Sequence, residues 1–326
     1  MRIPIKRLIF LMTVVLMLCG KGFAASSHDS IAASALFDRF ETVFYAKSDI
    51  VSASSTPKGF SDLEFSTFHY PFALLPGALH SLGEVAFREI FNGSDAILIG
   101  AKDFRAPEGT EGLGQVRSDF CYVIILKKDS GVQLRKYFTG SESPSASAAG
   151  SPVWHWSAKL NEFGRDDPRP SSLYFTQVSE AYLLVSNDLP DLQNTAGRLV
   201  SSDQDLQALH HVRDWYSLEG HQFWGYRRYR HAGIVNSVAA GTSEVTPGAE
   251  ALSFFLDFDK RMGVLHLFTS ATDEGTAAKM NARTTLPKFK REGPGIWEAS
   301  TPLAGNQGSA EQMFGVMYLF GFGVYL

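Results

Sequence analysis

The chain has 326 residues, of which 44% are hydrophobic, and 25 of them are phenylalanine. This composition provides enough apolar side chains for a large core, and the length fits one large domain or two ordinary ones. The chain carries 30 basic and 34 acidic residues, a net charge of −4 with neutral histidines. An acidic chain is a poor candidate for binding nucleic acid or anionic lipid headgroups.

The first 24 residues have the pattern of a secretory signal peptide. Basic residues at positions 2, 6 and 7 precede the apolar run Leu8–Leu18, and Gly22-Phe23-Ala24 offers small residues before a cleavage site. An apolar run this short does not span a bilayer, which takes about 20 residues. We therefore predict a secreted or periplasmic protein. A retained N-terminal anchor is the alternative, and lipid attachment at Cys19 is disfavoured because bulky Met17 and Leu18 precede it.

The mature chain is more acidic than the full sequence. Residues 1–24 contain four basic residues and no acidic ones, so 26 basic residues remain against 34 acidic ones, a net charge of −8. Cys121 is the one cysteine beyond this leader, so no intramolecular disulfide is expected in the mature chain. Because Cys121 lies within the apolar run Phe120–Leu126, we interpret it as a small buried hydrophobe rather than a nucleophile.

Hydrophobic periodicity predicts an alternation of short helices and strands. Helices are expected over Ile31–Phe40, Phe72–Phe91 and Ser202–Leu209, and after Asp273. Strands are expected over Thr42–Ala46, Asp95–Phe104, Val116–Lys127, around Trp154 and Trp156, and over Leu173–Val178, Tyr182–Val185, Phe223–His231, Leu252–Phe258 and Val264–Phe268.

The stretch Ala181–Val200 is the clearest local unit. The apolar strand Tyr182–Val185 is followed by Ser186-Asn187-Asp188, which can cap a helix, and Pro190 fits the first helical turn. Apolar residues then recur at helical spacing, namely Leu192, Ala196, Leu199 and Val200.

Similar units elsewhere lead us to predict an α+β protein made of repeated β-β-α modules, with mainly antiparallel sheets and helices packed on one face. The segment 140–152 is rich in Ser, Ala, Gly and Pro and is expected to be a linker or loop. It would separate an N-terminal half, 25–139, from a C-terminal half, 153–326.

A resemblance supports this modular expectation. The strand that ends in Leu-Leu-Val-Ser-Asn-Asp and enters a helix resembles a feature of uncharacterised secreted bacterial proteins built from β-β-α modules. The segment Phe223–Tyr229 is also similar to theirs, and the likeness covers Leu173–Ala282. It implies a fold and a compartment, but no chemistry, because those proteins have no assigned function.

The sequence contains no motif for nucleophilic, phosphate-binding or dinucleotide chemistry, so we predict no catalytic residues and no cofactor. His210-His211 with Asp214 lacks the spacing of a zinc site, and no metal site is predicted. Asp257 and Asp259 share a strand face and could bind a cation or flank a sugar, but a solvated strand end is the favoured interpretation. Asp273-Glu274 is better explained as the acidic first turn of a helix.

The richest cluster of rings and charges lies at the strand Phe223–His231. With a strand period of two, alternate residues face opposite sides, and each side combines aromatic rings with guanidinium groups. Such a surface can bind an anionic or sugar-like ligand, and the competing interpretation is a sheet face whose arginines pack on rings. The ligand-binding candidates are Trp224, Tyr226, Arg227, Arg228, Tyr229, Arg230 and His231.

The last 14 residues, Met313–Leu326, contain only apolar side chains and glycine. We favour a helix that packs on the last sheet, and the alternative is a tail that docks on a membrane or a partner. The sequence as a whole favours an exported, non-catalytic binding or envelope-associated protein whose partner is an unknown ligand or envelope protein. If the chain contacts a membrane, the contact is expected only through this C-terminal segment. The alternative function is a hydrolase or carbohydrate-active enzyme whose site is assembled from distant residues.

Overall fold

The computed structural model describes residues 28–37, 39–52, 70–72, 74–102, 119–138, 144–160, 169–201, 209, 212–213, 215–229, 248–257, 260–283 and 288–302. The strands in these ranges are β1 (Thr42–Lys47), β2 (Ser94–Ala101), β3 (Phe120–Leu126), β4 (Ala146–Ala148), β5 (Ser151–Leu160), β6 (Arg169–Val178), β7 (Tyr182–Ser186), β8 (Phe223–Arg228), β9 (Ala249–Asp257), β10 (Met262–Thr269), β11 (Lys290–Gly293) and β12 (Ile296–Pro302). The helices are α2 (His28–Phe37), α3 (Ser48–Ser52), α5 (Leu74–His80), α6 (Glu84–Gly93), α7 (Leu189–Val200), α9 (Trp215–Leu218) and α10 (Gly275–Arg283), with single turns η1 (Tyr70–Phe72) and η2 (Leu134–Lys136).

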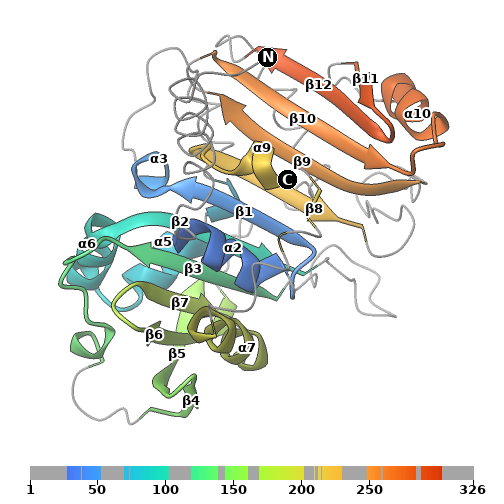
Figure 1. The fold of residues 1–326 in the computed structure, drawn as a ribbon. Coiled ribbons are helices and arrows are strands. Elements are labelled where there is room, and N and C mark those ends of the chain that lie inside the picture. Colours follow the sequence, from blue (N-terminus) through green and yellow to red (C-terminus); the bar gives the residue numbers. More distant parts are fainter. Residues whose placement is uncertain are drawn as a thin grey trace, which may run out of the picture.

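All twelve described strands belong to a single sheet, in the order β11-β12-β10-β9-β8-β1-β2-β3-β7-β6-β5-β4 (Figure 1). Every neighbouring pair is antiparallel. The prediction of an α+β fold built from repeated β-β-α modules is therefore wrong, because the described chain is mainly β and its strands join one continuous sheet.

The helices lie on both faces of this sheet, which corrects the prediction of one covered face. Helices α2, α7 and α9 pack on one face, and α5 and α6 pack on the other (Figure 1). The two predicted β-β-α units, β6-β7-α7 and β9-β10-α10, are not copies of each other. The buried residues of α7 lie on the α2 face, whereas Ala277 of α10 joins the core of the α5 face.

The central strands explain why both faces must be covered. All seven residues of β3 are buried, as are all five of β7. A strand that is buried on both faces is apolar without alternation, in contrast to a strand with one solvated face. Strand β10, further out in the sheet, instead alternates between half-buried and buried residues from Met262 to Leu267. The prediction of modules with one covered face treated these central strands like the outer ones.

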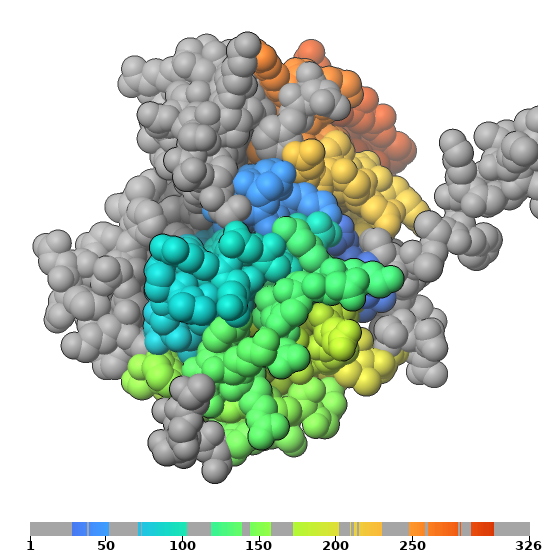
Figure 2. Space-filling view, turned by 90° about the vertical axis from the view of Figure 1, so that its left-hand side faces the viewer, coloured from blue at the N-terminus to red at the C-terminus, as the bar shows by residue number. Residues whose placement is uncertain are grey.

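The predicted helix Phe72–Phe91 is interrupted in the structure. It consists of α5 and α6, which are separated at Gly83, where the backbone φ is +107°. This left-handed conformation suits glycine and breaks a helix, although the apolar spacing continues on both sides. Figure 2 shows α6 beside the segment that follows β3, and Lys127 and Tyr137 of that segment bond to the Asn92 carbonyl and the Glu89 carboxylate.

The two predicted halves share the sheet. Strands β1, β2 and β3 of the first half lie in its middle, with β7–β4 on one side and β8–β12 on the other. The expected linker 140–152 contains β4, which pairs with the start of β5. No described helix is both long and apolar enough to cross a membrane. The segments 202–208 and Met313–Leu326, for which helices were predicted, lie outside the described residues.

Substitution of two glycines, one in the sheet and one in a helix, tests how closely their surroundings pack. A Cβ atom at Gly225 of β8 would lie 2.6 Å from Phe44 Cε1, whereas one at Gly197 of α7 would have no heavy atom within 4 Å. Gly225→Ala should therefore lower the free energy of unfolding by about 1–3 kcal/mol through overpacking. Gly197→Ala should raise it by about 0.5–1 kcal/mol because alanine favours the helix.

Urea unfolding monitored by circular dichroism measures both values. Equal effects of the two substitutions would contradict the close approach of the Phe44 ring to β8.

Candidate functional site

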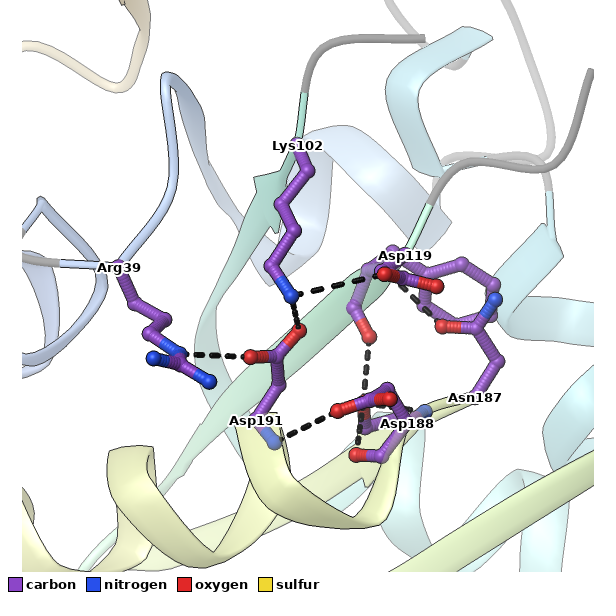
Figure 3. A network of polar contacts seen from close by, with 8 residues as sticks. Arg39, Lys102, Asp119, Asn187, Asp188 and Asp191 are labelled. Atoms are coloured by element: carbon purple, nitrogen blue, oxygen red, sulfur yellow. Dashed lines mark hydrogen bonds and ion pairs between the residues drawn. The ribbon is translucent and has the colours of Figure 1, made fainter. Parts of the chain in front are cut away.

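A network of polar side chains lies where strands β2, β3 and β7 meet helix α7 (Figure 3). Lys102 directly follows β2, Asp119 directly precedes β3, and Asn187 and Asp188 directly follow β7. Because neighbouring strands are antiparallel, the end of β2, the start of β3 and the end of β7 come together at one end of the sheet. Residues distant in sequence are thereby gathered at the N-terminus of α7.

The turn Ser186-Asn187-Asp188 attaches this helix to β3. The Asp188 carboxylate accepts a hydrogen bond from the Asp191 N–H at 2.8 Å, which caps α7 as predicted. Asn187 Oδ1 accepts the Phe120 N–H at 2.9 Å, and the Ser186 hydroxyl donates to the Phe120 carbonyl at 2.6 Å. The helix pattern is confirmed for Leu192, Ala196 and Leu199, which are buried, but Val200 is 58% exposed.

Asp191 is the centre of the network. Its side chain is fully buried, yet one carboxylate oxygen lies 2.7 Å from Arg39 Nε and the other 2.5 Å from Lys102 Nζ. A buried carboxylate is costly unless it is paired, and here two cations compensate it. Arg39 follows α2 and Lys102 follows β2, so this one side chain joins α2, β2 and α7.

The charge of the network also acts on Lys102. Partial burial by itself would lower the pKa of the Lys102 ammonium, but the contact with Asp191 and the charges of Asp191, Asp119 and Asp188 raise it overall. Lys102 Nζ also lies 3.5 Å from Asp119 Oδ2. The lysine is therefore firmly cationic and acts as the counter-ion of the cluster.

The three carboxylates of Asp119, Asp188 and Asp191 each place an oxygen within 4.8 Å of the other two, a spacing that could hold a metal ion. However, Lys102 and Arg39 already neutralise Asp191, and Asp188 serves as the helix cap. The arrangement is that of an internal ion-pair junction, in which the chain's own cations take the place that a metal ion would have.

The other acidic candidates have local partners or lie outside the description. Asp257 pairs with Lys260 at 2.9 Å, and this hydrogen bond lowers its pKa, while Asp259 lies outside the described residues. Asp273 accepts hydrogen bonds from Thr276 and Gly275 at the start of α10, and the Thr276 hydroxyl is the main cause of its lowered pKa. His210, His211 and Asp214 lie outside the described residues.

The predicted ligand-binding residues occupy the middle of the sheet, because β8 lies between β1 and β9. Trp224, Tyr226 and Arg227 are buried, with exposures of 2%, 3% and 4%. Arg228 and Tyr229 are half-buried, and Arg230 and His231 lie outside the described residues. The exposed part of the described candidate surface is therefore confined to Arg228 and Tyr229.

Trp224 is part of an aromatic cluster beneath α2 and α9. It stacks on Tyr45 with ring centroids 5.4 Å apart, and it lies against Phe37 and edge-on to Trp215. On the other face, the Arg227 guanidinium lies 5.2 Å from the centroid of the Tyr229 ring. These contacts pack the Trp224 ring and the Arg227 side chain within the protein.

Neither a protein-family model nor a curated protein sequence matches this chain. Among solved structures, crystal form III of TP0453 is similar with a TM-score of 0.44 and 9% identity, over 90% of this chain and 97% of that chain. Crystal form I has a TM-score of 0.45 and 8% identity, over 88% and 96% of the two chains, and form IV has 0.42 and 9%, over 86% and 95%. Scores of this size describe a distant likeness.

Loss of the central carboxylate should cost much more stability than loss of a surface one. Asp191→Asn leaves Arg39 and Lys102 without their buried counter-charge and should lower the free energy of unfolding by about 3 kcal/mol. The control Asp95→Asn removes a solvent-exposed partner of Lys47, 3.1 Å away, and should cost less than about 1 kcal/mol. Chemical denaturation of both variants measures these losses of unfolding free energy. Equal losses would show that Asp191 does not organise the junction.

The two neighbouring arginines of β8 should also differ in how much they contribute to thermal stability. Arg227→Ala removes a buried side chain packed on Tyr229 and should lower the melting temperature by several degrees. Arg228→Ala removes a half-buried side chain that donates a hydrogen bond of 3.3 Å to the Phe37 carbonyl, and should change the melting temperature less. Differential scanning calorimetry measures both, and the reverse order would contradict the assigned burial.

Proposed function

We propose that the chain is an exported, non-catalytic binding protein. The export part of the proposal rests on the sequence pattern of residues 1–24. The observation that carries the non-catalytic part is the use of Asp191, whose fully buried carboxylate is committed to Arg39 and Lys102. This polar cluster thus serves to join α2, β2 and α7.

The thiol of Cys121 is consistent with this proposal. It is fully buried in β3, and burial raises its pKa to about 12. A thiol with such a pKa is protonated at neutral pH, and a protonated thiol is a poor nucleophile. Cys121 therefore acts as a packing residue of the α2 face, as the sequence predicts.

The charge of the mature chain limits the proposed partners. A net charge of −8 repels nucleic acid and anionic surfaces, so we propose an envelope protein or another neutral or basic ligand as the partner. The proposed contact of Met313–Leu326 with a membrane concerns residues outside those described.

One specific observation favours a hydrolase as the second candidate. Ser253 of β9, His266 of β10 and Glu298 of β12 occupy directly opposed positions on consecutive strands, and His266 Nε2 lies 3.3 Å from Glu298 Oε2. This is the order of residues that an acyl-transfer triad requires. Ser253, however, is fully buried, so its hydroxyl is shielded from a substrate carbonyl.

A fluorophosphonate probe separates the two functions, because it labels activated serine nucleophiles covalently. We expect no labelling of the full-length protein above the level of Ser253→Ala. Ser300→Ala is the matched control, since it removes a neighbouring hydroxyl that donates to Glu298 at 2.9 Å. Labelling that is lost in Ser253→Ala and retained in Ser300→Ala would establish the hydrolase and overturn the non-catalytic proposal.

A further inference from the structure

The outer edge of β5 is the longest open strand edge of the described sheet. Strand β4 pairs with Ser151–Val153, the first residues of β5, and no described strand pairs with that edge from Trp154 onward. The pairing stops for a local reason. Ala146 is the first residue of β4, the Ser145 N–H before it already bonds to the Val153 carbonyl, and Pro144 has no N–H with which to continue the pairing.

The pairing of β4 with β5 shows in which direction the unpaired backbone groups of β5 point. The Val153 carbonyl accepts the Ser145 N–H at 2.9 Å, so the polar backbone groups of Val153 point away from β6. The period of two along a strand then points the N–H and C=O groups of His155 and Ser157 outward as well. Both side chains are exposed.

The two faces of this edge differ in polarity. Trp154 belongs to the core of the α5 face, and Phe138 lies against it with ring centroids 5.2 Å apart. Trp156 is half-buried next to the same Phe138, at 5.9 Å. His155 lies on the opposite face, where it packs against Tyr174. An additional strand at this edge would therefore extend an apolar face on one side and a polar face on the other.

The opposite edge of the sheet is protected in a way that this edge is not. Three of the four residues of β11 are charged, namely Lys290, Arg291 and Glu292. Charged residues on an edge strand discourage the addition of another strand. The stretch Trp154–Ser157 carries no such charge apart from a histidine, and Lys159 is the first charged residue further along β5. Its tryptophans face the α5 side, where Trp154 is buried and Trp156 is half-buried.

We infer that the outer edge of β5 is a docking site for an extended strand of a partner protein, added antiparallel to β5 in line with β4. The partner segment carries apolar side chains at alternate positions, which lie beside Trp154 and Trp156, and polar side chains between them. Main-chain hydrogen bonds to His155 and Ser157 supply the affinity in this mode of recognition, and the tryptophan face supplies the selectivity. This inference rests on the proposed binding function.

The occupant is a partner strand rather than a second copy of the chain. The edge continues an interface that the protein already makes with a short extended segment of its own, β4. A stable dimer interface buries about 1,200–2,000 Å² in total, which is far more than a few residues of strand edge provide. An added peptide strand needs no such area, because its backbone groups pair along its whole length.

The test uses a fluorescein-labelled, acetylated peptide of alternating valine and threonine, with a peptide of the same composition and contiguous valines as its control. Fluorescence anisotropy with the full-length protein should show binding of the alternating peptide and at least ten-fold weaker binding of the control. Ser157→Pro removes an outward N–H that β6 does not use and should weaken binding at least ten-fold, whereas Ser157→Ala keeps that N–H and should bind like the parent protein.

Amide hydrogen exchange of the unmodified protein provides a second measurement that needs no variant to fold. The His155 and Ser157 amides should exchange rapidly in the free protein and become protected when the alternating peptide is added. Slow exchange in the free protein, equal binding by Ser157→Pro, or dimerisation that Ser157→Pro abolishes would each overturn the inference. None of these outcomes depends on fluorophosphonate labelling, so failure at this edge and failure of the non-catalytic proposal are distinguishable.

Discussion

Burial of both faces of the central strands is the constraint on which the rest of the structure depends. Strands β2, β3 and β7 are apolar on both faces, so both faces must be shielded from solvent. A single layer of helices can shield only one of them. Helices α5 and α6 cover one face, while α2 and α7 cover the other. The strands that extend the sheet beyond this double-covered centre, such as β10 and β12, return to the alternation of a half-solvated surface.

The ion pairs of Asp191 help to attach helix α2, which has little apolar area of its own to bury against the sheet. Helix α2 is short, and its buried residues include Ala32, Ala33 and Ala35, which bury little area each. A directed contact at its C-terminal end therefore matters more than it would for a helix rich in large side chains. Arg39 provides that contact through Asp191, and Lys102 fixes the same carboxylate to the end of β2. The buried Asp191 carboxylate thus holds α2 and α7 in place against the sheet.

Local patterns in the sequence predicted most of the strands and the α7 cap, but they could not predict long-range partners. The turn Ser186-Asn187-Asp188 signalled a helix start by its residue types, and Asp188 fulfils that role. Nothing in the neighbourhood of Arg39 or Lys102 points to Asp191, because their meeting depends on strand order, which the sequence does not encode locally. The single covered face was predicted wrongly because the runs of β3 and β7 were predicted as strands without using their lack of alternation, which indicates burial on both faces. Strand β11 was missed because its residues are charged and exposed, and β12 was missed because its apolar residues are mixed with polar ones without a clear alternation.

The aromatic and basic stretch of β8 shows how position in a sheet decides what a side chain can do. Its composition suits a ligand surface, and the same composition suits the centre of a sheet that needs large rings on both faces. With β1 and β9 on either side, Trp224 and Tyr226 fill the core beneath α2 and α9, and Gly225 leaves room for the Phe44 ring on the other side. The rings near β5 have a different environment, because Trp154 and Trp156 lie on a strand with a neighbour on one side along most of its described length. At the centre of the sheet such rings are fully used in packing, whereas at the β5 edge Trp154 is buried and Trp156 remains half-buried.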